Sequence, residues 1–175
     1  MCLALYLAAS QGLPLIPWDQ ANPAFHVLRL PKRADGVRKH FRGKFVYYAA
    51  SAQGCSCAFN YEHEDDSILQ LKNYLRNALI CVKEVEVFAC QVGAEEQETQ
   101  HALTSSPEGI ALADFSFKDG QHLTVRLGNS SLRASEAEKC LQRVTRPVPL
   151  FNRRAHRDPT LHAASVGPPN HQLAH

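Results

Sequence analysis

The sequence predicts an α+β protein with a mostly antiparallel sheet and two or three helices packed on one face of it. Strand-like segments outnumber helical ones, and two connections look like tight hairpins. The regular strand–helix alternation and Gly-rich phosphate loop of a doubly wound nucleotide-binding fold are missing from the sequence. With 175 residues, 45% of them hydrophobic and 21% charged, the chain has the size and composition of about one globular domain.

Strands are predicted where apolar and β-branched residues cluster. Residues 2–9 are apolar on both alternating faces, which is typical of a central strand. Residues 25–30, 45–50 and 85–92 are further strands. The clearest two-residue alternation runs from Cys55 to Tyr61 and predicts another strand.

A last pair of strands is predicted around Asp119-Gly120. Phe115 and Phe117 precede this dipeptide, and alternating apolar residues follow it up to Leu127. Asp-Gly suits the two-residue turns that match strand twist, so the segment predicts a hairpin. Residues 94–109 are polar and are expected to form a loop.

Three helices are predicted. A short one covers residues 33–41, and a longer one begins at Asp65 or Asp66 and runs to about Cys81 with one apolar face. Ser135 and Glu138 have the spacing of a capping box, which predicts a short helix ending near residue 144.

A composition change near residue 145 divides the chain. Residues 1–144 are expected to form the single globular α+β domain. Residues 145–175 contain five of the ten prolines and four of the nine histidines, and their basic residues outnumber the acidic ones. Their apolar residues show no period, so this Pro/His/Arg-rich tail is predicted to be disordered.

Charge and the N-terminal segment limit the location and the partners. The net charge of +2 makes nucleic-acid binding unlikely. No apolar run approaches the roughly 18 residues of a membrane-spanning helix. The apolar start has no basic residue before it, unlike a secretory signal. A cytoplasmic protein with reduced thiols is therefore expected.

The most specific chemical feature is the pair Cys55-x-Cys57. On a strand, side chains two residues apart share a face, so the two thiols would lie side by side and could hold a soft metal such as zinc or iron. Zinc takes four ligands, and Cys2 with His63 or His26 could complete the set. The preferred hypothesis is a small thiol- or metal-binding protein that uses this pair.

The alternative is a non-catalytic domain that recognises a protein partner. Cys55 and Cys57 would share their face with Phe59, and a free cysteine in such a position packs as a small hydrophobic residue. Cys81 and Cys90 lie in apolar runs and are expected in the core. A buried pair would be part of the packing and would carry no chemistry.

A third hypothesis concerns Cys2. If the initiator methionine is removed, the thiol lies beside the terminal amine, as in N-terminal-nucleophile amidohydrolases. Those enzymes continue with Gly-rich segments, whereas this chain continues with Leu-Ala-Leu-Tyr-Leu.

Two charged segments receive simpler explanations. The acidic cluster 62–66 around His63 suits a helix N-terminus, where carboxylates are favoured. Basic residues between Lys32 and Lys44 are expected to form a solvated surface.

Several motifs together resemble a family of small bacterial proteins with no known function. They are the opening Met-Cys-Leu-Ala-Leu-Tyr, the stretch Leu-Pro-Leu-Ile-Pro-Trp at 13–18, Val-Arg-Lys-His-Phe at 37–41, and Gly-Cys-Ser-Cys-Ala-Phe at 54–59. The resemblance covers about residues 1–127 and implies a bacterial cytosolic protein without an assigned activity. The family pattern has glycine where this chain has Ser56 and Ala58.

Overall fold

The computed structural model describes residues 2–21, 23–60 and 66–128 and shows a mixed six-stranded sheet with helices. The order of strands across the sheet is β2-β3-β1-β4-β6-β5. All neighbours pair antiparallel except β5 and β6, which are parallel. The α+β class is confirmed.

The elements in chain order are β1 (Leu3–Ala9), β2 (His26–Arg29), the 3₁₀ helix η1 (Lys32–His40), β3 (Phe45–Ala50), η2 (Cys57–Asn60), α1 (Ser67–Ala78), β4 (Val85–Gln91), β5 (His101–Ser105), α2 (Pro107–Ile110) and β6 (Gln121–Val125).

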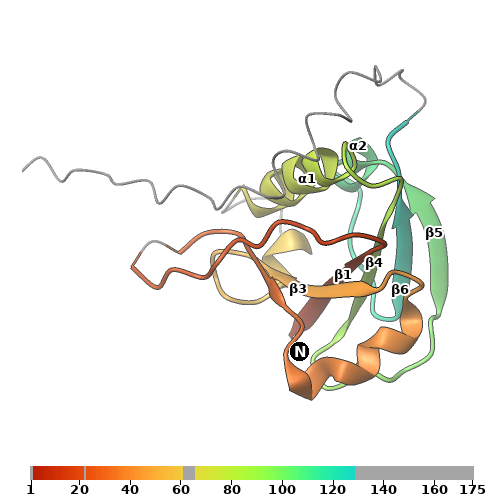
Figure 1. The fold of residues 1–175 in the computed structure, drawn as a ribbon. Coiled ribbons are helices and arrows are strands. Elements are labelled where there is room, and N and C mark those ends of the chain that lie inside the picture. The colour runs from red at the N-terminus through yellow and green to blue at the C-terminus, as the bar shows by residue number, and fades with distance from the viewer. Residues whose placement is uncertain (1, 22, 61–65, 129–175) are drawn as a thin grey trace, which may run out of the picture.

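The sheet has a hydrophobic cluster on each face. In β1, Leu5 and Leu7 face the side covered by α1 and α2, while Tyr6 faces the side covered by η1. Figure 1 shows α1 and α2 on one side of the sheet and η1, in orange, on the other. The sequence suggested helices on one face only. The difference arises because β1 and β4 are apolar on both faces, so each face needs a cover.

The predicted strand from Cys55 to Tyr61 is wrong for its described residues, since they form a bend followed by η2. Gly54 adopts a φ of 77° at the end of the turn that begins at Ser51 and leads into the bend. The Ser56 carbonyl then accepts a hydrogen bond from Phe59 N–H at 3.2 Å. Phe59 is buried through this helical turn, so the apolar alternation did not require a strand.

The predicted hairpin around Asp119-Gly120 is also wrong. β6 follows this turn, but it pairs with β4 and β5 and not with the segment before it. The Asn60 side chain binds both the N–H and the carbonyl of Phe117, at 2.7 and 2.8 Å. That pairing holds the preceding segment against η2.

The segment 94–109 is more ordered than its polar composition suggested, because it contains β5 and α2. Strand β5 was missed because its residues lack apolar alternation and are mostly exposed. The helix expected near residues 135–144, the boundary at 144/145 and the tail 145–175 lie outside the described residues. Within the part that the structure describes, no helix has both the length and the apolar character to cross a bilayer.

Candidate functional site

The thiols of Cys55 and Cys57 lie in the bend that joins β3 to η2. Both residues are half-buried, and Cys2 at the start of β1 is exposed. The N–H of Leu3 donates a hydrogen bond to Cys57 Sγ at 3.2 Å. This contact places the Cys57 thiol beside the first residues of β1, so the bend and the N-terminal segment form one site.

Ser56, between the two cysteines, anchors the bend in the sheet. Its side chain is fully buried; its hydroxyl donates to the Ala49 carbonyl at 2.7 Å and accepts from Leu5 N–H at 3.0 Å. Leu5 and Ala49 are register partners in β1 and β3, so this hydroxyl bridges the two strands. The flanking thiols are thereby held against the end of the sheet.

Ser51 fixes the other side of the bend. Its hydroxyl donates to the Cys55 carbonyl at 2.8 Å, and its backbone N–H donates to the same oxygen at 3.0 Å. Gly54 N–H donates in turn to the Ser51 carbonyl at 3.0 Å. The Cys55 backbone is therefore fixed, and its side chain remains partly open to solvent.

The thiols of Cys55 and Cys57 are close enough to influence each other's protonation. Burial raises the pKa of the Cys55 thiol above its ordinary value, the Cys57 backbone N–H lowers it, and the hydrogen bond and charge of the Cys57 thiol raise it, with a smaller contribution from Cys2. Burial also raises the pKa of the neighbouring Tyr48 phenol. At neutral pH the Cys55 thiol is therefore expected to be mostly protonated.

The site joins three of the cysteines that the sequence singled out, though not as a metal cage. Among the residues that the structure describes, no group of three or more His, Cys, Asp or Glu side chains is placed to hold a metal ion. His26 lies elsewhere: it is buried, its ring packs 4.8 Å from that of Trp18, and its Nδ1 is 3.2 Å from the Ala24 carbonyl oxygen. His63 lies outside the described residues.

The remaining described cysteines differ in burial. Cys90 is fully buried in β4, as expected, and burial raises its pKa to about 12. Cys81 is only half-buried, because it lies in the turn that follows α1 and not in the centre of the core.

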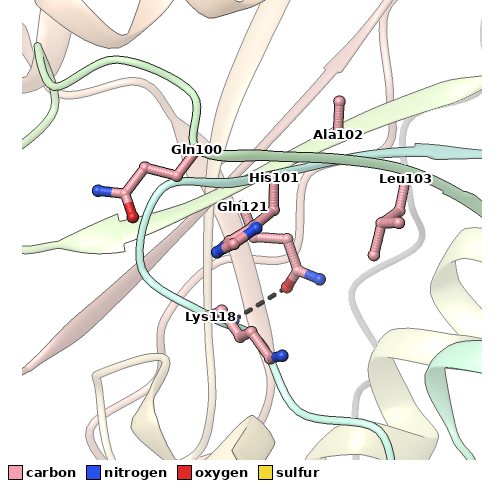
Figure 2. A pocket seen from close by; sticks show the side chains of 6 residues that line it. All are labelled: Gln100, His101, Ala102, Leu103, Lys118 and Gln121. Atoms are coloured by element: carbon pink, nitrogen blue, oxygen red, sulfur yellow. Dashed lines mark hydrogen bonds between the residues drawn. The ribbon is translucent and has the colours of Figure 1, made fainter.

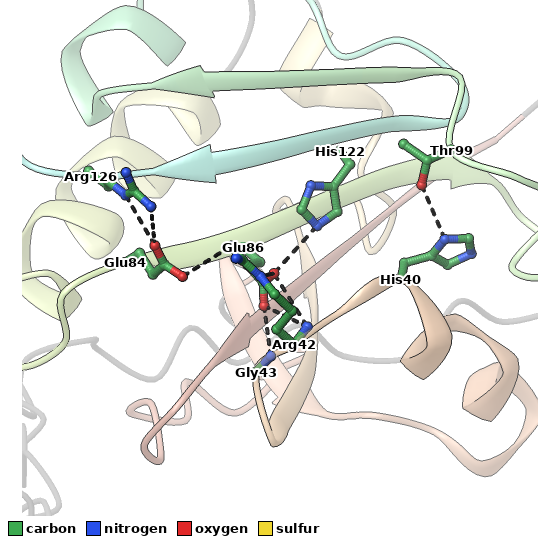
Figure 3. A network of polar contacts seen from close by, with 8 residues as sticks. All are labelled: His40, Arg42, Gly43, Glu84, Glu86, Thr99, His122 and Arg126. Carbon is green, nitrogen blue, oxygen red and sulfur yellow. Dashed lines mark hydrogen bonds and ion pairs between the residues drawn. The ribbon is translucent and has the colours of Figure 1, made fainter.

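A second polar cluster, which the sequence analysis missed, surrounds Glu86 in β4 (Figure 3). The Glu86 carboxylate is buried and accepts hydrogen bonds from Arg42 N–H at 3.0 Å, Gly43 N–H at 2.7 Å and Arg42 Nε at 3.2 Å. His122 Nε2 lies 3.8 Å from the same carboxylate. A lone acidic residue within the apolar run Val85–Gln91 was the signal that could have revealed this cluster.

These contacts give the cluster an architectural role. They fasten the turn between η1 and β3 to the centre of the sheet. Burial lowers the pKa of His122, while the charge of Glu86 raises it less, so the imidazole is expected to be neutral at pH 7.

Three basic side chains of the segment 32–44 contact other groups of the protein. Arg38 pairs with Asp35 at 2.6 Å, and Lys39 donates to the Glu96 carbonyl. Arg42 binds Glu84 as well as Glu86. Two of the six basic residues of this segment are thus paired with carboxylates, and all six are exposed, in keeping with the solvated surface that the sequence indicated.

Comparisons with known proteins give no further guide to this site. A scan against protein-family models found no match, and searches of curated proteins and of solved structures found none that was significant.

Proposed function

We propose that the chain is a small thiol protein in which Cys55 and Cys57 alternate between a dithiol and a disulfide. The observation that carries the proposal is that both thiols lie, half-buried, in one bend that the hydroxyls of Ser51 and Ser56 anchor. A bend also keeps residues two apart close enough for a disulfide, which needs Cα atoms roughly 4.4–6.8 Å apart.

The reaction is thiol–disulfide exchange with a second disulfide. One cysteine thiolate attacks a sulfur of that disulfide and releases a thiolate, which leaves a mixed disulfide. The second cysteine then attacks the mixed disulfide and releases the other thiolate. The pair gives up two electrons and two protons, and the acceptor disulfide becomes two thiols.

The remaining residues of the site would support this chemistry. Leu3 N–H donates to Cys57 Sγ and so stabilises negative charge as it develops on that sulfur. The bonds of Ser51 and Ser56 hold the backbone on both sides of Cys55. The raised pKa of Cys55 implies a slow reaction at neutral pH that accelerates as the pH rises.

Metal binding by the same pair is the other candidate function. The two thiols could contribute to a zinc or iron site, but structural zinc takes four ligands, and among the described residues no three candidate ligands come together. The dithiol reaction needs no further ligand, so it requires less beyond what the site holds.

The test uses the reduced full-length protein and a graded series of oxidised-to-reduced glutathione, followed by peptide mass mapping. The wild-type peptide containing Cys55 and Cys57 is expected to lose two hydrogen atoms as both thiols disappear together. Cys57→Ala should instead trap glutathione on Cys55. Cys2→Ala should oxidise like the wild type, and buried Cys90 provides an internal unreactive control.

Two results would overturn the dithiol proposal. One is that Cys55 and Cys57 react only after the protein unfolds. The other is that the purified protein carries stoichiometric zinc or iron that is lost in Cys55→Ala, which would support the metal site instead.

A further inference from the structure

Strand β5 forms one edge of the sheet and has an unusual surface for an edge. Its residues His101 to Thr104 are all exposed, and the Leu103 side chain is 54% exposed. It contains no Lys, Arg, Asp, Glu or Pro, the residues that commonly keep edge strands from pairing with other chains.

The opposite edge of the sheet is protected. There, the chain segment before β2 returns beside the strand, and Ile16 and Val27 exchange two backbone hydrogen bonds of 3.0 and 2.9 Å. Within residues 2–21, 23–60 and 66–128, β5 pairs only with β6.

The backbone groups of β5 that face outward can be assigned from its pairing. His101 N–H bonds to Gly120, and the Ser105 carbonyl accepts from Arg126. In a parallel ladder alternate residues bond to the same neighbour, so His101, Leu103 and Ser105 face β6. Ala102 and Thr104 therefore direct their N–H and carbonyl groups away from the sheet.

This pattern is complementary to itself. If two copies of β5 run antiparallel with their Leu103 residues opposite each other, Ala102 of each copy lies opposite Thr104 of the other. Each of these two pairs can exchange two N–H to carbonyl hydrogen bonds, which uses all the outward groups of both residues. The central Leu103 residues then form a close pair that buries apolar surface.

The surroundings of the strand leave room for this contact. An open hollow of about 420 Å³ lies beside β5. Figure 2 shows the side chains that line it, which are those of Gln100, His101, Ala102, Leu103, Lys118 and Gln121. The strand is uncharged apart from its histidine, so the twofold arrangement brings no pair of like charges from β5 together.

We propose that the chain forms a dimer by antiparallel pairing of β5 with β5 of a second copy, which extends the sheet across both molecules. Because the strand has only five residues, the interface is small and the dimer weak, with a dissociation constant of about micromolar or above. This inference is independent of the thiol chemistry at Cys55 and Cys57.

The test is sedimentation velocity on the full-length protein over a wide concentration range. The wild type should shift from monomer to dimer. Leu103→Lys and Leu103→Glu should each raise the dissociation constant at least about tenfold, because like charges would face each other. Val92→Lys, at a residue 58% exposed outside β5, is the matched control and should dimerise like the wild type.

A mixture of Leu103→Lys and Leu103→Glu should recover the dimer, because opposite charges then meet across the twofold axis. Such recovery would also show that both variants fold. Amide hydrogen exchange gives a second measurement: Ala102 and Thr104 should be protected more strongly as the protein concentration rises.

Three outcomes would overturn the proposal: a monomer at every concentration, a dimer that the Leu103 variants leave unchanged, or variants that stay monomeric when mixed. Protection of Ala102 and Thr104 that does not depend on concentration would likewise overturn it, because another segment of the same chain would then cover the edge.

Discussion

The Ser56→Ala substitution tests whether one buried hydroxyl joins the thiol bend to the sheet. It removes a single oxygen that accepts from Leu5 N–H at 3.0 Å and donates to the Ala49 carbonyl at 2.7 Å. The side chain is fully buried, so water cannot easily replace either contact. Each buried group left without a partner costs about 1–3 kcal/mol. Two groups lose their partner, so a loss of about 2–6 kcal/mol in the free energy of unfolding is expected.

The assay is urea unfolding of the full-length protein. At a denaturant slope of about 2 kcal/mol/M, this loss would lower the midpoint by about 1–3 M. The bend should also detach locally, so Cys55 and Cys57 should react faster with a thiol reagent under native conditions. Ser116→Ala, at an exposed serine, is the matched control and should change the free energy by less than about 0.5 kcal/mol.

The reasoning would be refuted if Ser56→Ala lost less than about 0.5 kcal/mol and left both thiol rates unchanged. The hydroxyl would then be dispensable, and the anchoring of the bend would have to come from Ser51 and η2.

Three further predictions concern the other face of the sheet. Glu86→Gln should lower the free energy of unfolding in urea by about 1–3 kcal/mol, because it weakens the hydrogen bonds to Arg42 and Gly43. Glu84→Gln, at a more exposed ion pair, should lower it by less than about 1 kcal/mol. Equal losses in the two variants would contradict the role given to burial. Gly43→Ala should lower the free energy of unfolding by about 1–3 kcal/mol, because the added Cβ would lie 2.7 Å from Ala9 N. Gly128→Ala, where the added Cβ meets open space, should leave the free energy of unfolding unchanged. A Gly43→Ala protein as stable as the wild type would show that the turn can move. Burial lowers the pKa of both His40 and His122. Their contribution to stability is therefore present above the ordinary histidine pKa near 6.5 and is lost as the pH falls below it towards the lower folded values. His122→Asn should reduce this loss, and an unchanged dependence of stability on pH in that variant would refute the assignment.

The elements with strong apolar patterns were predictable from local sequence. β1, β3, β4 and α1 lie close to their predicted positions, since alternation and helical periodicity report which side chains must be buried. The apolar residues on both faces of β1 and β4 require a cover on each face, although the sequence analysis placed the helices on one face only. The α+β class follows from these elements, because they contribute most of the buried apolar surface.

The weak or ambiguous segments depended on partners distant in sequence. β5 exists because β6 provides hydrogen bonds along it, and nothing in its polar composition indicates that neighbour. The segment around Phe117 is bound by Asn60, which lies 57 residues away in the chain. Glu86 is satisfied by backbone N–H groups 43 and 44 residues away, so only the folded chain explains how a carboxylate is buried in an apolar strand.

For the candidate site, the sequence determined which groups are available, namely two thiols one residue apart and a third near the N-terminus. It placed the two thiols on a strand, whereas they lie in a bend. Tertiary structure decided their burial, their hydrogen bonds and the protonation of Cys55, because these properties depend on β1, β3 and Ser56 arriving from separate parts of the chain. Side-chain chemistry is encoded locally, whereas its electrostatic environment is created only by long-range packing.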